Sequence, residues 1–365
     1  MNINRKVYTA AAGVLAACLA AATASAQNFM VYQYGASAGA VSQVSVANLA
    51  PNWVATGVRN SAGVMEVITW ESNGTQLLRK GSATGNVVDN TGISTVALSP
   101  TRVITAGISD GLVELMSWTV NASGAVEFFG YVTNESAKSI SLAKLDSSRV
   151  IAAVEDITGA LTMTVFLVSS DGAVSYGGAD PTYEQVSLVG IAAIGGSEVV
   201  SAVRNSAGDL QLDSWLVGTD DLSVHQGTAS AGAVSLLDIT AWDSGHVATP
   251  VRNSAGDLEL IDWAVNPTTG AIARESSKTV GASSQVAAST IGGLIFTASV
   301  NSSGKVDAGV WGYNGTQIEE GVSTQEEAAT AVAAAPLSTG LYSVTASCTK
   351  AGNLKVDVWS GDYVP

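Results

Sequence analysis

The sequence predicts an all-β protein made of seven similar units, and two observations support this prediction. The segment Val-Arg-Asn-Ser-Ala-Gly occurs three times, beginning at Val58, Val203 and Val251, and a Trp follows seven residues after each of its glycines. When this frame is carried along the chain, aromatic residues recur at intervals of 48 or 49 residues, at Trp70, Trp118, Phe166, Trp215, Trp263, Trp311 and Trp359. This regular spacing indicates seven copies of one structural unit, with the repeated aromatic in the core.

Each unit is predicted to contain four short strands. In the fifth unit, apolar and polar residues largely alternate from Asp257 to Trp263, as a half-buried strand requires. Turn clusters rich in Asn, Ser, Pro and Gly interrupt the pattern at short and regular intervals. We predict strands at 233–241, 246–252, 257–265 and 271–277. The Ala-rich run from Glu326 to Pro336 resembles a helix in isolation, but the frame predicts a first strand there.

The two ends of the chain indicate how the units are arranged. A four-stranded unit cannot bury both of its faces, so the units must stack in an open solenoid or in a closed ring. The last unit ends after its third strand, near Trp359, whereas Val31–Ser42 matches Val224–Ser235, a fourth strand followed by the start of the next unit. Residues 28–35 are therefore expected to lie beside residues 353–360, which closes the ring and hides the strand edges.

The predicted order of strands resembles that of WD40 propellers, with the aromatic near the end of the third strand. The Gly-His and Trp-Asp signatures of that family are absent, so the resemblance is one of architecture only. We predict that residues 27–365 form one seven-bladed β-propeller with four-stranded blades, closed by the N-terminal strand.

The segment 1–26 has the pattern of a signal peptide. Arg5 and Lys6 are followed by an apolar stretch and by Ala24-Ser25-Ala26, a typical cleavage site. The expected location is therefore secreted or periplasmic. A second interpretation stays open, because Leu15-Ala16-Ala17-Cys18 resembles a lipobox, in which Cys18 would carry a lipid anchor.

The charge and the cysteine content exclude several classes of protein. The formal charge is −15, and it becomes −17 without Arg5 and Lys6. Such an acidic surface repels phosphate groups, which argues against nucleic acid and anionic membrane surfaces as partners. No other run approaches the ~18 apolar residues of a membrane span. Only Cys348 remains after the leader, so no intrachain disulfide is expected.

The repeated turn supplies the candidate ligand-binding residues. The turn between the second and third strands is expected on the same face as the crossovers between units. This face collects Arg59, Asn60, Arg204, Asn205, Arg252 and Asn253. The planar fork of Arg suits carboxylates, sugar hydroxyls or sulfate, and its recurrence suits a multivalent ligand. The alternative is an ordinary turn in which Arg pairs with a neighbouring carboxylate.

Two tryptophans lie outside the repeat frame. Trp53 and Trp242 are either platforms for a ligand or filler between units.

Catalytic and metal-binding patterns are sparse. His225 and His246 lie on different strands of successive units, so neither a catalytic triad nor a multi-His metal site has an obvious source. Glu66, Glu114 and Glu259 recur four residues before the aromatic, and we predict that this recurrence marks a solvated strand face. No enzyme activity, cofactor or metal ion is expected.

The sequence therefore favours a secreted or surface-exposed binding propeller, with a lectin-like role in which the turn face binds a glycan. Two alternatives are a scaffold or adhesion subunit that binds another exported protein, and a hydrolase or lactonase with its site at the central channel.

Overall fold

Alternating apolar residues and frequent turns produce an architecture of strands only. The computed structural model describes residues 29–313, 318–320, 324–337 and 341–362, and no helix occurs among them. The predicted leader, with Cys18, lies outside these residues. None of the described segments forms a helix with the length and apolar character that crossing a bilayer requires.

The strands form seven antiparallel sheets, which we number as blades 1 to 7 in chain order. Blades 1 to 3 contain β1 (Phe29–Ala50), β2 (Trp53–Asn60), β3 (Val64–Ser72), β4 (Leu77–Val87), β5 (Ser94–Ser99), β6 (Arg102–Ser109), β7 (Leu112–Val120), β8 (Val126–Lys144), β9 (Arg149–Asp156), β10 (Ala160–Val168) and the first part of β11 (Val174–Gly195). Blades 4 and 5 continue with β12 (Glu198–Asn205), β13 (Asp209–Val217), β14 (Ser223–Leu237), β15 (Thr240–Asp243), β16 (His246–Asn253), β17 (Asp257–Val265) and β18 (Ile272–Ile291). Blades 6 and 7 add β19 (Leu294–Asn301), β20 (Lys305–Tyr313), β21 (Ile318–Glu320), β22 (Thr324–Leu337), β23 (Tyr342–Thr349) and β24 (Asn353–Asp362).

Several long strands connect one blade to the next. In β11, the residues up to Gln185 pair with β10 of blade 3, and those from Val186 onward pair with β12 of blade 4. The outermost strand of one blade thus continues as the innermost strand of its neighbour. The strands predicted for the fifth unit are confirmed, except that the first is divided between the end of β14 and β15. The Ala-rich run is also a strand, as predicted, and lies in β22.

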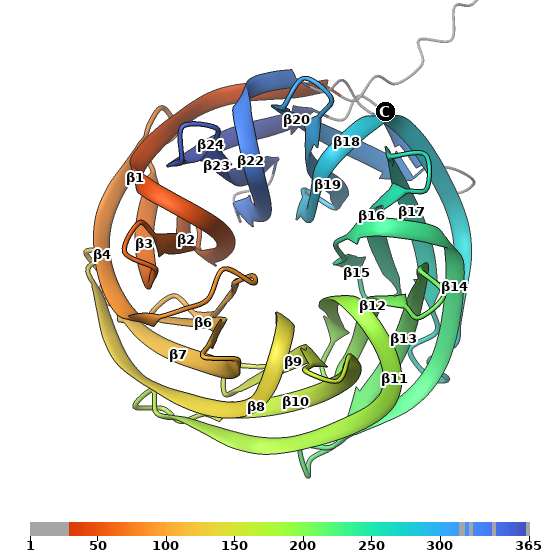
Figure 1. The fold of residues 1–365 in the computed structure, drawn as a ribbon. Coiled ribbons are helices and arrows are strands. Elements are labelled where there is room, and N and C mark those ends of the chain that lie inside the picture. The colour runs from red at the N-terminus through yellow and green to blue at the C-terminus, as the bar shows by residue number, and fades with distance from the viewer. Residues whose placement is uncertain (1–28, 314–317, 321–323, 338–340, 363–365) are drawn as a thin grey trace, which may run out of the picture.

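The ring closes through the N-terminal strand. The first half of β1 pairs antiparallel with β24, with Phe29 opposite Asp362, Tyr32 opposite Trp359 and Ser37 opposite Lys355. The red start of the chain therefore lies beside its blue end in the ring of Figure 1. This pairing confirms the predicted closure and supplies the fourth strand of blade 7.

The repeated Trp is buried in the contacts between blades, and its indole N–H has the same partner in six blades. It donates to the hydroxyl of a Thr or Ser on the second strand at 2.8–3.0 Å, in the pairs Trp70–Thr56, Trp118–Thr105, Trp215–Ser201, Trp263–Thr249, Trp311–Thr297 and Trp359–Thr345. Blade 3 has Phe166 in place of Trp, and Ala152 stands where the hydroxyl would be. The donor and its acceptor are therefore absent together, so no buried polar group is left unpaired.

Further hydrogen bonds connect neighbouring blades at the turns between third and fourth strands. The hydroxyl of Ser214 donates to the carbonyl of Gly270 at 2.6 Å, and Thr69 reaches Gly124 in the same way. Arg102 donates to the carbonyl of Asp171 at 3.0 Å, and Arg149 to that of Gly218 at 3.2 Å. These bonds hold adjacent blades in a fixed orientation.

Candidate functional site

The three repeated arginines connect blades through polar groups of the fold. The Nε of Arg204 donates to the carbonyl of Val234 at 2.8 Å, and its Nη1 donates to the hydroxyl of Ser187 at 3.0 Å. Val234 begins the inner strand of blade 5, whereas Ser187 belongs to blade 4. Arg59 and Arg252 repeat this arrangement with Val88, Ser42, Ser283 and Ser235. A backbone carbonyl and a hydroxyl therefore take the place of the carboxylate partner considered from the sequence.

The neighbouring asparagines close the turns. The Oδ1 of Asn205 accepts from the backbone N–H groups of Ala207 and Asp209, both at 3.0 Å, and Asn60 and Asn253 do the same in their own blades. Gly208 has a φ of 87°, and a Cβ built there would lie 3.2 Å from Nη2 of Arg204. The turn needs Gly both for its left-handed backbone and for the space beneath the guanidinium.

Two of the three arginines share a depression in the surface. Arg204 and Arg252, together with Ser235 and Asn253, line a hollow of about 290 Å³ between blades 4 and 5. Arg59 lies in blade 1, away from this pair. The structure thus brings together two of the predicted arginines and leaves the third by itself.

The contacts of Trp53 and Trp242 are those of filler between blades. Trp53 packs on the core between blades 1 and 2, and a side chain at Gly124 would overlap its ring. Trp242 packs on the core between blades 5 and 6, donates from Nε1 to Asp262 at 3.0 Å, and stacks on His246 with ring centroids 4.8 Å apart. Both rings are half-buried.

The prediction that the recurring glutamates lie on a solvated face is wrong for Glu114, while Glu66 and Glu259 are half-buried. Glu114 is only 3% exposed and accepts a hydrogen bond from Asn86 of the preceding blade. Glu66 and Glu259 form ion pairs with Arg79 at 3.1 Å and with Arg274 at 2.8 Å. Each arginine belongs to the fourth strand of the same blade as its glutamate, so these two glutamates are half-buried. A neighbouring blade covers Glu114, through Asn86.

A concentration of polar groups surrounds a hollow between blades 3 and 4. The hollow measures about 690 Å³ and is lined by Asp180, Thr182, Glu184, Gln211, Asp213, Trp215, His225 and Thr228. The outer part of β11 supplies one wall, and β13 and β14 supply the other. Sequence reasoning missed this site because its walls come from different blades.

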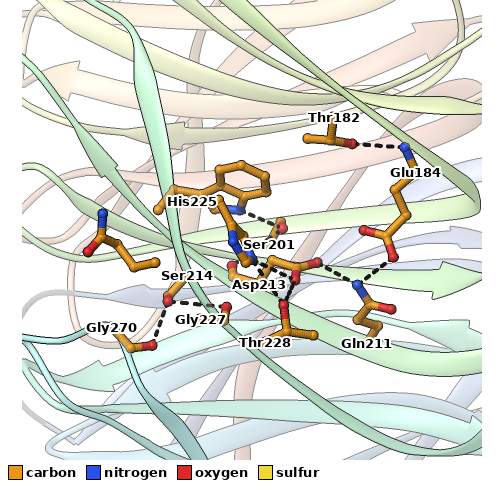
Figure 2. A network of polar contacts seen from close by, with 12 residues as sticks. Thr182, Glu184, Ser201, Gln211, Asp213, Ser214, His225, Gly227, Thr228 and Gly270 are labelled. Carbon is orange, nitrogen blue, oxygen red and sulfur yellow. Dashed lines mark hydrogen bonds and ion pairs between the residues drawn. The ribbon is translucent and has the colours of Figure 1, made fainter.

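A connected network orients the side chains of this hollow, as Figure 2 shows. Gln211 donates from Nε2 to Glu184 at 2.6 Å and to Oδ2 of Asp213 at 3.0 Å. The other oxygen of Asp213 accepts from the hydroxyl of Thr228 at 2.6 Å and lies 3.2 Å from Nε2 of His225. Asp213 is 2% exposed, so it acts as the buried centre around which the other groups are arranged.

The electrostatics of the network distinguish its two carboxylates. Burial raises the pKa of Glu184, and the charge of Asp213 raises it further, while the hydrogen bond from Gln211 and the charge of His225 act in the opposite direction. Both oxygens of Asp213 are already occupied by side chains of the protein. Because it is only 2% exposed and bonded on both oxygens, Asp213 orients the neighbouring side chains and presents little of its own surface to the hollow.

Binding is the chemistry that these groups support. The side chain of His225 is 48% exposed, so it faces the hollow and the solvent. Within the described ranges, no three His, Cys, Asp or Glu side chains are grouped in a way that could hold a metal ion. The sequence holds a partial signal for the site: Asp213 stands two residues before the repeated aromatic, where three units have the apolar residues Ile68, Met116 and Ile261, although Asp357 shares the position.

Comparison with known proteins shows similarity at the level of structure. No family model and no curated protein matches the sequence. The β-propeller domain of Cps50 (Swd1) from Myceliophteria thermophila aligns with a TM-score of 0.60 at 12% identity, covering 91% of this chain and 99% of that domain. The WD40 domain of coronin from Toxoplasma gondii aligns with a TM-score of 0.58 at 13% identity, covering 93% of this chain and 85% of that chain. A periplasmic gluconolactonase from Pseudomonas aeruginosa aligns with a TM-score of 0.58 at 13% identity, covering 77% of this chain and 85% of that chain.

At such identities the alignments show the fold alone. Together with the seven sheets and the pairing of β1 with β24, they establish that this chain is a seven-bladed β-propeller with a WD40-like order of strands.

Proposed function

We propose that the protein is a secreted or periplasmic binding propeller that takes a neutral glycan into the hollow between blades 3 and 4. The observation that supports this function is the convergence of hydrogen-bonding side chains from two blades on one hollow of about 690 Å³. That volume lies within the range of about 300–1,000 Å³ that small-molecule sites occupy.

The chemistry of the lining favours a ligand rich in hydroxyl groups. Asp180 and Glu184 present carboxylate oxygens, which accept hydrogen bonds from sugar hydroxyls. His225 adds a ring that can donate or accept. A phosphate, sulfate or carboxylate on the ligand would be repelled by these acids and by the net charge of −15. A neutral glycan supplies many hydroxyl groups and carries no negative charge.

The network also pre-orients the site. Gln211 and Thr228 hold Asp213, and Gln211 in turn holds Glu184, so few rotamers must be fixed when a ligand arrives. Groups that are ordered in advance lower the entropy cost of binding.

A glycan array followed by calorimetry on the glycans that bind tests the function. Glu184→Ala and His225→Ala should each weaken binding by about tenfold, which corresponds to about 1.4 kcal/mol. The double variant Arg204→Lys with Arg252→Lys, which changes the turn face, should bind as the wild type does. An array with no signal would overturn the proposed function.

The same experiment tests a second candidate position for the ligand, on the turn face. Arg204 and Arg252 share the hollow between blades 4 and 5, and two guanidinium groups at one depression suit the sulfate or carboxylate of an acidic glycan. Loss of binding in the double Arg variant, with binding retained in Glu184→Ala, would assign the ligand to this turn face.

A further inference from the structure

The contact between blades 5 and 6 contains a second hollow, at the corresponding place in the repeat. It measures about 380 Å³ and lies between Val280 and Gly281 on β18 and Asp307, Gly309 and Trp311 on β20. As between blades 3 and 4, the outer strand of one blade here faces the third strand of the next.

Two glycines line this hollow. Gly309 stands two residues before the repeated aromatic, where the other units have Ile68, Met116, Thr164, Asp213, Ile261 and Asp357. A Cβ built at Gly281 would meet no atom within 4 Å, so open space lies in front of it. Neither glycine has a φ in the left-handed region. The backbone conformation does not require either glycine. Gly281 leaves open space, whereas a Cβ built at Gly309 would lie 3.1 Å from Oγ1 of Thr297 and 3.3 Å from Nε1 of Trp311.

In four other blades, the third strand receives a polar partner from the outer strand of the blade before it. These pairs are Asn86 with Glu114, Glu135 with Thr164, Glu184 with Gln211 and Glu327 with Lys355. The outer-strand partners all follow the repeated aromatic of their own unit at nearly the same separation, and Gly281 occupies the corresponding position after Trp263. Asp307 therefore faces a glycine where Glu114, Gln211 and Lys355 face a polar side chain. Gly232, between blades 4 and 5, occupies the same position in the repeat.

Asp307 has one carboxylate oxygen without a hydrogen-bond partner. Its Oδ2 accepts from Nδ2 of Asn301 at 3.1 Å, whereas Oδ1 is buried and bonded to nothing in the described part of the chain. Burial raises the pKa of Asp307, and the hydrogen bond from Asn301 and the charge of Lys305 oppose this effect. A buried carboxylate oxygen beside an open hollow is favourable only when a donor reaches it.

We propose that the hollow between blades 5 and 6 binds a primary alkylammonium group, as carried by a polyamine or by a lysine side chain of another protein. The ammonium would pair with the carboxylate of Asp307, whose side chain lines the hollow, and the alkyl chain would lie along Leu258 and Val280. The buried hydroxyl of Ser299, also in the wall, can accept a second hydrogen bond. This site is separate from the one proposed for glycans.

NMR titration of the ¹⁵N-labelled protein tests the site. The probes are 1,5-diaminopentane, a peptide with one lysine and blocked ends, and 1-butanol as a neutral comparison. Binding of either amine should shift the amide signals of Gly281 and Gly309, while 1-butanol should not. Shifts with the diamine alone would assign the site to free polyamines, and shifts with the peptide would assign it to lysine side chains.

Matched variants locate the binding. Asp307→Asn should weaken amine binding at least tenfold, and Gly281→Leu should abolish it by filling the hollow. Gly232→Leu is the control, because Gly232 also has an ordinary φ and open space before it, but lies between blades 4 and 5. Amine binding that is absent, or unchanged in Asp307→Asn, would overturn the proposal. Glycan binding by Asp307→Asn, measured in parallel, keeps this result independent of the proposed function.

Discussion

The hydrogen bond between the repeated Trp and the hydroxyl of the second strand should couple these two residues energetically. In blade 5, Nε1 of Trp263 donates to Oγ1 of Thr249 at 2.9 Å, and both residues are completely buried. Trp263→Phe removes the donor and leaves a buried hydroxyl without a partner. Thr249→Val keeps the shape of the side chain but leaves the indole N–H without an acceptor.

The magnitude follows from the cost of an unsatisfied buried group. Each single variant leaves one such group, which costs about 1–3 kcal/mol, and Trp263→Phe adds a cavity cost because the ring is smaller. The double variant leaves neither group unpaired. It should therefore be less destabilised than the sum of the single variants by about 1–2 kcal/mol, a coupling within the range found for residues in contact. Blade 3 shows that the pair can be replaced as a unit, because Phe166 there coincides with Ala152.

Equilibrium unfolding in urea, followed by tryptophan fluorescence and by far-UV circular dichroism, measures this coupling. Coincident transitions and equal m-values in all four proteins are needed before the free energies of unfolding are compared. Additivity of the two single changes within about 0.3 kcal/mol would refute the reasoning, because uncoupled sites behave in that way.

Two further predictions concern stability. Burial raises the pKa of Asp238 to about 6, while backbone N–H groups of Ala288 and Ile239 oppose the shift. The unfolded chain therefore releases this proton near pH 4, and the folded protein releases it only near pH 6. The free energy of unfolding should fall by at most about 3 kcal/mol as the pH rises through this window. Asp238→Ala should flatten the pH profile of the free energy of unfolding, and an unaltered profile would contradict the assignment. Gly208→Ala should cost about 1–2 kcal/mol because φ is 87° and the new Cβ would press on the guanidinium of Arg204. Gly232→Ala, with open space and an ordinary φ, should change the denaturation midpoint little, and equal effects of the two changes would count against this explanation.

The repeat frame was sufficient to predict the blades, the closure by β1 and the strand at the Ala-rich run, because each depends on period and order along the chain. The role of the arginines depends on contacts across blades, which the frame does not contain. A sequence signal for it does exist: Ser42, Ser187 and Ser235 each stand 17 residues before an Arg and accept its hydrogen bond.

The hollow between blades 3 and 4 escaped prediction for a related reason. Its residues are ordinary polar side chains at positions where the repeat alternates, and only the stacking of neighbouring sheets reveals which of them are buried. Glu114 shows the same effect, since a position that is predicted to be solvated within one unit is covered by the preceding one. Burial in a repeat protein depends on the neighbouring unit as much as on the strand itself.

The pairing of β1 with β24 has a consequence for the order of folding. Phe29 and Asp362 stand opposite each other although nearly the whole chain separates them, so this sheet can form only after the last strands have been synthesised. Blade 7 is then the final blade to be completed, and contacts of such high sequence separation form slowly. Until they form, the edges of β1 and β24 are exposed to other chains, which makes this interval the one in which a folding assistant would help most.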